Sequence, residues 1–365
     1  MKKIFTVLTS IALTFALSFS AAFANDDALI KSQNYLKTIT LDSPDAVIAY
    51  EATGMEADYK ADALLNNFKE TDYVTASYGD LAKSIIAISL LGENPKDFNN
   101  TNLVEILENR VQEDGTLTND VNGGCGATIW TLMALETVNS PKVKAVADKL
   151  STIAMDNGAY WYEYQGPNAD LDTTGWAMEA LSVAGRSTYK AAISKAYTFV
   201  QSKLNSTDGY YDNWGGNADT QSCVLEGLSV AGYTLDTNAY NYLLSYQNED
   251  GTFNALNYST GQLEPNAYAS VEGARALGVI NNGSFVLKAR QDYTKTTTPV
   301  VTEPETPTKP STTTPAVKPE TTTTEPKKET VKVVNTGDNT NVMAYVVAAI
   351  AAVGVIVLVI KSKKK

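Results

Sequence analysis

The segment Asp172-Thr-Thr-Gly-Trp-Ala-Met-Glu-Ala-Leu-Ser-Val-Ala-Gly185 recurs 47 residues later as Asp219-Thr-Gln-Ser-Cys-Val-Leu-Glu-Gly-Leu-Ser-Val-Ala-Gly232. Part of the pattern returns again at Glu272 and Gly278. Weaker copies surround Trp130 and cover residues 78–92 and 44–54, which makes six copies. A period near 46 residues is typical of stacked supersecondary units.

Each copy predicts a pair of helices. The quoted segments are small and apolar with few charges, as buried inner helices require, and glycines such as Gly185 and Gly232 stand where a helix ends. Amphipathic segments such as 193–200 lie between them and have helical spacing. No sustained strand-like alternation is present. The pattern predicts an all-α domain over residues 25–292, with six inner helices surrounded by six outer ones.

Glycine turns follow most of the predicted outer helices. They contain Gly115, Gly158, Gly209 and Gly251, each preceded by Asp or Asn, a pair that favours positive φ. We expect the residue two positions after each glycine to pack the turn down. These residues are Leu117, Tyr160, Tyr211 and Phe253.

The turn Gln247-x3-Gly251-x-Phe253 resembles the Q-x(2–5)-G-x-W repeat of squalene cyclases and protein prenyltransferase β-subunits. The Asp-Thr pairs at the predicted inner-helix starts, as at Asp172 and Asp219, resemble the same superfamily. This resemblance covers 25–292 and implies the terpenoid cyclase-like fold, an α6/α6 toroid of six helix-pair repeats.

Both ends of the chain carry export and anchoring signals. Residues 1–24 have two lysines, an apolar run and Ala22-Phe23-Ala24, which predict a cleaved signal peptide. Residues 342–360 are uncharged and long enough for a transmembrane helix, and the basic tail 361–365 favours the cytoplasmic side. Residues 293–341 are rich in Thr and Pro, which predicts a disordered stalk.

The stalk ends in Val333-Val334-Asn335-Thr336-Gly337, followed by the span and the lysines. This order resembles a Gram-positive cell-wall sorting signal, in which a sortase cuts between Thr and Gly and joins the Thr to peptidoglycan. Val333 and Val334 stand where that signal has Leu and Pro. Wall linkage and a simple membrane anchor therefore both remain open. Either anchor predicts an ectodomain on the cell surface.

Composition excludes several functions. The formal net charge is −12, from 41 Asp and Glu against 29 Lys and Arg, and six of the lysines lie at the two ends of the chain. The rest is therefore more acidic still, so nucleic-acid binding is not expected. The chain has no histidine, which argues against the zinc site of prenyltransferases, and we expect no metal. Cys125 and Cys223 are expected to be buried residues rather than a disulfide.

Aromatic residues gather in the loops expected at the mouth of the toroid, where all inner helices begin. An aromatic rim with carboxylates over a cavity is typical of a ligand site. The alternative is that single rings only pack the loops onto the helices. The candidate ligand-binding residues are Tyr160, Trp161, Tyr162, Glu163, Tyr164, Tyr210, Tyr211, Trp214, Phe253 and Tyr258.

Asp170-Leu171-Asp172-Thr173-Thr174 resembles the D-x-D-D-T motif of class II terpene cyclases, with Thr173 in place of the third acid. The resemblance implies that Asp172 is a catalytic acid and Asp170 its partner. The alternative is that Asp caps the helix, a role that Asp219 would repeat, and the repetition favours capping.

Three functions follow. The first is a surface module that binds a small, partly apolar ligand, namely a corrinoid, an isoprenoid or a glycan; no other cofactor is expected. The second is an enzyme, either terpene-cyclase-like or glycan-cleaving, that uses Asp172 with a carboxylate from Glu163, Asp170 or Asp212. The third is an adhesin that binds protein through tyrosines on the outer helices. Those tyrosines include Tyr189, Tyr240 and Tyr246.

Overall fold

A computed structural model describes residues 26–56, 62–118, 120, 124–162, 166–211 and 216–297. Within these ranges the chain is mostly helical, with thirteen helices and two short antiparallel hairpins. The predicted signal peptide, most of the stalk, Thr336, Gly337, the span 342–360 and the tail 361–365 lie outside the described residues. None of the described helices is long and apolar enough to cross a membrane.

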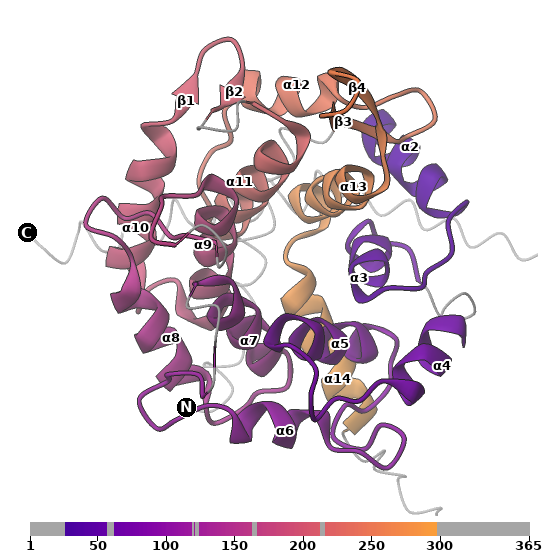
Figure 1. Ribbon diagram of the computed structural model, residues 1–365, viewed down its shortest axis with the longest axis vertical. Helices are drawn as coiled ribbons and strands as arrows, with labels where there is room; N and C mark the ends of the chain where they lie inside the picture. The colour runs from indigo at the N-terminus through magenta and orange to yellow at the C-terminus, as the bar shows by residue number, and fades with distance from the viewer. Residues whose placement is uncertain are drawn as a thin grey trace, which may run out of the picture. The chain divides into compact units, whose positions relative to one another are not determined.

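Six helices are buried along most of their length, and they coincide with the six predicted inner helices. Each contacts the next in chain order, and the last contacts the first (Figure 1). Most of their side chains are inaccessible to solvent, and the small residues among them allow neighbouring helices to approach closely. The six are α3 (Pro44–Ala52), α5 (Tyr78–Leu90), α7 (Gly126–Thr137), α9 (Leu171–Gly185), α11 (Ala218–Ala231) and α13 (Ala267–Asn282).

A second set of helices packs against the first. In this set α8 contacts α7 and α9, α10 contacts α9, α12 contacts α11, and α2 contacts α13. Figure 1 shows the set lying around the buried helices. Its members are α2 (Asp26–Leu36), α4 (Asp62–Glu70), α6 (Leu103–Asn109), α8 (Val143–Ile153), α10 (Lys190–Gln201) and α12 (Thr237–Ser245).

Side-chain caps fix where most of the buried helices begin. In α3, α5, α9, α11 and α13 the cap oxygen accepts a hydrogen bond from the backbone N–H three residues on, which satisfies a group with no partner inside the helix. The caps are Ser43, Ser77, Asp170, Asn217 and Asn266.

The turn at Gly251 shows how the predicted glycine turns hold neighbouring units together. Gly251 has φ 85°, and a Cβ there would lie 2.0 Å from the carbonyl oxygen of Lys31 on α2. The amide of Gln247 donates to the Ala28 carbonyl and to Ser32 Oγ, both at 2.9 Å. The turn of the last unit is thereby pressed onto the first helix of the domain.

The buried residue after the turn differs from the prediction in one copy. Leu117, Tyr160 and Phe253 are buried as expected, but Tyr211 is 48% exposed and Tyr210 is fully buried instead. Tyr210 pairs with Leu204 across the turn, the place that Phe253 takes opposite Gln247. The paired residues are six apart in both turns, but Gly209 stands five residues after Leu204 whereas Gly251 stands four after Gln247, so the residue next to Gly209 takes the buried position.

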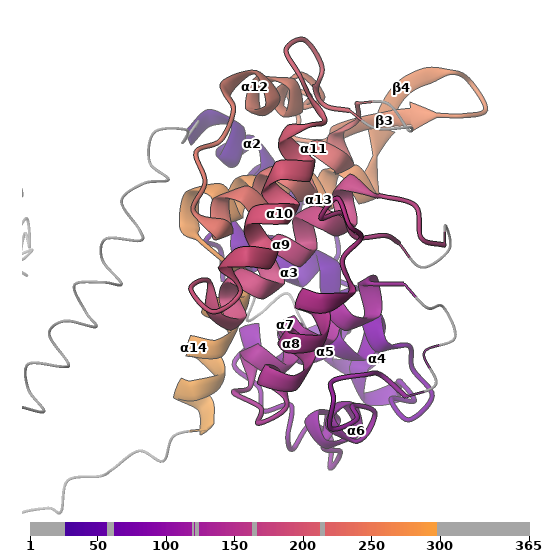
Figure 2. The ribbon, with the colours of Figure 1, turned by 90° about the vertical axis from the view of Figure 1, so that its left-hand side faces the viewer.

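Two hairpins were not predicted from the sequence. Strands β1 (Leu204–Asn205) and β2 (Gly209–Tyr210) form the smaller, and β3 (Phe253–Asn257) pairs with β4 (Gln262–Asn266) in the larger. The β3–β4 hairpin projects from the helices (Figure 2). Strands β1 and β2 have only two residues each, and β3 (Phe-Asn-Ala-Leu-Asn) does not alternate strictly between apolar and polar residues, so the sequence pattern did not indicate them.

A further helix, α14 (Phe285–Thr297), runs past residue 292, the expected end of the domain. It crosses the C-terminal ends of α3, α5 and α7, which it contacts (Figure 2). Its Lys288 Nζ lies 2.6 Å from Glu51, Arg290 forms an ion pair with Glu136, and Thr296 donates to the Gly92 carbonyl. Helix α14 therefore covers the C-terminal ends of α3, α5 and α7.

Candidate functional site

Each buried helix has three residues at spacing i, i+4, i+7 that begin in its first turn, and we call each set of three a stripe. This spacing places the three residues on one helix face. Contacts between stripes, such as Lys83 with Asp45 and Arg275 with Glu226, show that these faces meet. The polar and aromatic members are Asp45, Lys83, Trp130, Asp172, Trp176, Glu179, Asp219, Cys223, Glu226, Tyr268, Glu272 and Arg275.

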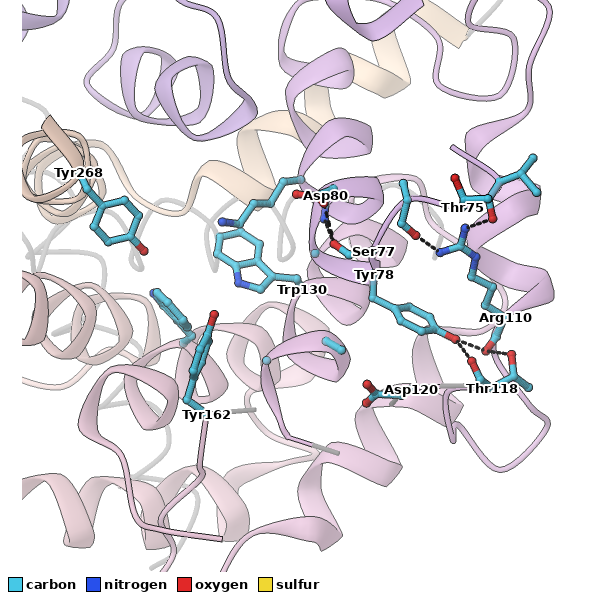
Figure 3. A pocket seen from close by; sticks show the side chains of 17 residues that line it. Thr75, Ser77, Tyr78, Asp80, Arg110, Thr118, Asp120, Trp130, Tyr162 and Tyr268 are labelled. Carbon is cyan, nitrogen blue, oxygen red and sulfur yellow. Dashed lines mark hydrogen bonds between the residues drawn. The ribbon is translucent and has the colours of Figure 1, made fainter. Parts of the chain in front are cut away.

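A cavity of about 680 Å³ opens at the N-terminal ends of α5 and α7. Figure 3 shows Trp130, Tyr162 and Tyr268 pointing toward a common space from different elements. The volume lies within the range of small-molecule sites, roughly 300–1,000 Å³. The lining residues are Val74, Thr75, Ala76, Ser77, Tyr78, Gly79, Asp80, Lys83, Arg110, Thr118, Asp120, Gly126, Ala127, Trp130, Tyr162, Trp176 and Tyr268.

Two tryptophans form the deepest wall of this cavity. The rings of Trp130 and Trp176 meet edge to face with centroids 5.8 Å apart. Trp130 also stacks on Phe285, and Lys83 Nζ lies 4.6 Å from its centroid. Trp176 is 8% exposed, and within the described part of the chain its Nε1 has no hydrogen-bond partner. A buried indole N–H normally finds an acceptor, so this buried donor is an exception among the described residues.

The opposite wall is held rigid by backbone contacts. The Tyr78 hydroxyl donates to the carbonyls of Thr118 at 2.6 Å and Arg110 at 3.1 Å. The Arg110 guanidinium donates to the carbonyls of Tyr73, Val74 and Ala76 (Figure 3 shows this group). Arg110 therefore fixes the loop before α5 and leaves few donors for a ligand.

The two cations of the stripes are paired with carboxylates. Lys83 Nζ lies 2.9 Å from Asp45 Oδ1. Arg275 is buried, with Nε 3.0 Å from Glu226 and Nη2 3.7 Å from Glu272. The stripes hold six carboxyl groups and two cations, so the interior is acidic.

Burial shifts the titration of these acids. Desolvation, opposed by Arg275, raises the pKa of Glu272 to about 7 and the pKa of Asp219 to about 6. Desolvation and the neighbouring Glu226 carboxyl raise the pKa of Glu179, although Ser284 donates to Glu179 at 3.0 Å. Glu272 and Asp219 therefore exchange a proton near neutral pH, which suits them to transfer a proton.

The residues predicted to surround the mouth differ in burial and in whether they line the cavity. Tyr162 lines the cavity, and Trp161 is half-buried beside it. Tyr211 and Tyr258 are exposed, at 48% and 82%. Glu163, Tyr164 and Trp214, and also Asp212, lie outside the described residues.

Tyr160, Tyr210 and Phe253 are fully buried and pack under the turns, so the packing alternative describes their side chains in this structure. Each donates its backbone N–H to a side chain of the following buried helix. The acceptors are Thr174 at 3.0 Å, Gln221 at 2.9 Å and Ser270 at 2.7 Å.

Asp170 is the cap of α9, where it accepts from Thr173 N at 2.8 Å. Asp172 and Asp219 are not caps, contrary to the capping alternative, because α11 is capped by Asn217. Both acids lie in the first turn of their helices, where the partial positive charge of the N-terminus favours a carboxylate. Asp170 therefore serves as the cap of α9, and a catalytic role of Asp172 with Asp170 as its partner stays a prediction.

The sequence interpretation missed Trp130, Trp176 and Tyr268 as cavity residues, although the stripe spacing contained the signal. Tyr189, Tyr240 and Tyr246, expected on the outer surface, are each less than 8% exposed, which corrects that expectation. Cys125 and Cys223 are buried and free, as predicted. In the described part of the chain no cluster of acidic and cysteine side chains has the arrangement of a metal site.

The sequence matches no known family model and no curated protein.

Proposed function

We propose that the described helices form an α6/α6 toroid of the prenyltransferase and squalene-cyclase type. Three observations support this. The buried helices contact one another in a closed sequence from α3 to α13 and back to α3. The six repeats coincide with six buried helices, and the Gly251 turn ties the last unit to α2.

We propose further that the protein is a cell-surface binding module for a small, partly apolar ligand, in the class of a corrinoid, an isoprenoid or a glycan. The observation that carries this proposal is the cavity of about 680 Å³ with aromatic rings from five separate segments. Flat aromatic walls with a few polar groups are typical of such sites. The cavity lining includes the first turns of α5 and α7, so the ligand would enter from the N-terminal ends of these helices.

Native mass spectrometry of the full-length chain, after exposure to culture medium and cell-wall extract, tests this function. We expect a discrete added mass that is lost in Tyr162→Ala and Trp176→Leu. Tyr258→Ala, at an 82% exposed ring outside the cavity lining, is the matched control and should keep the ligand. Retention of the added mass by all variants would move the ligand elsewhere, and no added mass would refute the binding function.

An enzyme remains the second candidate, because the raised pKa values of Asp219 and Glu272 suit an acid near neutral pH. In this proposal Asp172, which holds the same position on α9 as Asp219 does on α11, donates the proton to an isoprenoid double bond or a glycosidic oxygen. Conversion of such a substrate should stop in Asp172→Asn and continue in Asp148→Asn, a surface control on α8. Equal activity in both variants would remove Asp172 from the mechanism.

We also propose that the chain is exported and anchored at the cell surface, by a sortase to peptidoglycan or by the span 342–360. Protease treatment of intact cells should release fragments of the helical unit. Thr336→Ala should release the protein into the medium only if wall linkage operates. Protection of the helical unit in intact cells would contradict surface exposure.

A further inference from the structure

The charged side chains that line the cavity balance one another. Lys83 and Arg110 stand against Asp80 and Asp120 in the lining. A charged ligand in this space would meet as many like charges as opposite charges, so its charge would gain little from the lining. We therefore expect a ligand without net charge.

Two tyrosine rings offer the accessible aromatic surface of the cavity. Tyr268 is 53% exposed and Tyr162 is partly buried, and both point toward the same space from separate segments (Figure 3). Trp130 and Trp176 shape the wall but are only 5% and 8% exposed, so they present little of their rings. A ligand that uses the accessible rings needs a flat apolar face to stack on them.

Hydrogen-bonding capacity remains on the first turns of α5 in the same lining. Asp80 and Lys83 are three residues apart on one helix face, and both line the cavity. The exposed Asp80 carboxylate accepts from Ser77 Oγ at 2.8 Å, and a carboxylate has about four acceptor positions. Lys83 Nζ contacts both oxygens of Asp45, at 2.9 and 3.1 Å, and an ammonium group has a third N–H to donate. Hydroxyl groups, which both donate and accept, can use both side chains at once.

The volume of the cavity limits the size of the ligand. About 680 Å³ equals roughly 23 water volumes of about 30 Å³ each, which is close to the number of non-hydrogen atoms in a disaccharide. A corrinoid is several times larger and could not be enclosed. An isoprenoid would cover Asp80 and Lys83 with hydrocarbon and offer them no hydrogen bond, which costs free energy.

We propose that the ligand of this cavity is a neutral saccharide no larger than a disaccharide. The C–H face of a pyranose ring stacks on Tyr162 and Tyr268, and its hydroxyl groups donate to Asp80 and accept from Lys83. This inference rests on the proposed binding function and selects the glycan from the three ligand classes given there.

Saturation-transfer difference NMR on the full-length chain tests this class, because the method detects weak binding. The probes are four neutral disaccharides, namely cellobiose, lactose, maltose and diacetylchitobiose, with geraniol as the isoprenoid and cellobiouronic acid as the anionic comparison. We expect a signal from at least one neutral disaccharide, strongest at its ring C–H protons, and a weaker signal from both comparison compounds. No signal from any of the four at about 10 mM, or a stronger signal from either comparison compound, would overturn the inference.

Variants then locate the site. Tyr268→Leu removes a flat ring, and Asp80→Ala removes an acceptor at an exposed position, so each should weaken disaccharide binding at least about fivefold. Tyr258→Leu, at an exposed ring outside the lining, is the matched control and should keep the affinity. Unchanged affinity in both cavity variants would overturn the inference. If native mass spectrometry instead finds an isoprenoid or a corrinoid that is lost in Tyr162→Ala, this inference fails while the proposed binding function stands.

Discussion

The close contact between α9 and α11 predicts whether a glycine-to-alanine change raises or lowers stability. Helices α9 and α11 approach so closely that a Cβ on Gly227 would lie 2.1 Å from the carbonyl oxygen of Gly175. A Cβ on Gly175 would in turn lie 2.3 Å from the carbonyl oxygen of Cys223. We expect Gly227→Ala to destabilise the protein, although the same change stabilises most helices.

Two opposing effects set the magnitude. Alanine is favoured over glycine inside a helix by about 1 kcal/mol. Against this, the 2.1 Å contact must open to at least 3.0 Å, and the atoms in the way are backbone atoms of a packed helix rather than a flexible side chain. Over-packing typically costs about 1–3 kcal/mol and sometimes more, and a rigid neighbour favours the upper end. The net loss of unfolding free energy should be about 2 kcal/mol.

Thermal unfolding followed by circular dichroism checks this value. A loss of about 2 kcal/mol corresponds to a decrease in Tm of roughly 4–8 °C for a domain of this size. Gly79→Ala is the matched control, because its Cβ would meet only Ser77 Oγ at 3.9 Å. The control should keep or slightly raise the Tm. If Gly227→Ala is as stable as the wild type, the backbone contact between α9 and α11 is not as close as described.

Three further predictions concern charges. Arg275→Met should lower the unfolding free energy by about 3–5 kcal/mol in urea titrations, because it leaves Glu226 and Glu272 buried without their cation. Burial raises the pKa of Glu272 to about 7, so the folded state holds a proton that the unfolded state releases. The contribution of Glu272 to the free energy of unfolding should therefore fall as pH rises from about 4.5 to about 7. Glu272→Gln should flatten this slope between about pH 5 and 8. Arg290→Met removes the partly buried ion pair between α14 and Glu136 and should lower the free energy of unfolding by about 1–3 kcal/mol. Lys144→Met removes an exposed ion pair and should change the free energy of unfolding by less than about 0.5 kcal/mol.

The repeat made the arrangement of helices predictable. Helix α9 begins one residue before the quoted segment and ends at Gly185, and α11 ends beside Gly232, whose φ of 75° explains the glycine. These predictions succeeded because small apolar residues at a fixed period leave few alternatives to packed helix pairs. Gly251 was predictable for a similar reason, since its positive φ and the close approach to Lys31 exclude a side chain.

Other features depended on tertiary contacts that no local pattern specifies. Tyr160 and Phe253 were candidate ligand residues, yet their rings are buried, because an aromatic side chain near a mouth serves equally to pack a turn. Asp170 and Asp172 look alike in the sequence, but only the backbone of α9 decides which one caps it. Helix α14 buries Phe285, Val286, Ala289 and Tyr293, and it is also held by ion pairs with Glu51 and Glu136, which are distant in the chain.

The interior acids take different roles at the two ends of the buried helices. Toward the C-terminal ends, α14 brings Lys288 to Glu51 and Arg290 to Glu136, so that these carboxylates are neutralised by the protein itself. Toward the N-terminal ends, burial raises the pKa of Asp219 to about 6, and the charge of Arg275 opposes this shift. The carboxylates under α14 are therefore paired directly with its cations, whereas Asp219 keeps a raised pKa because the cost of burial outweighs the effect of Arg275.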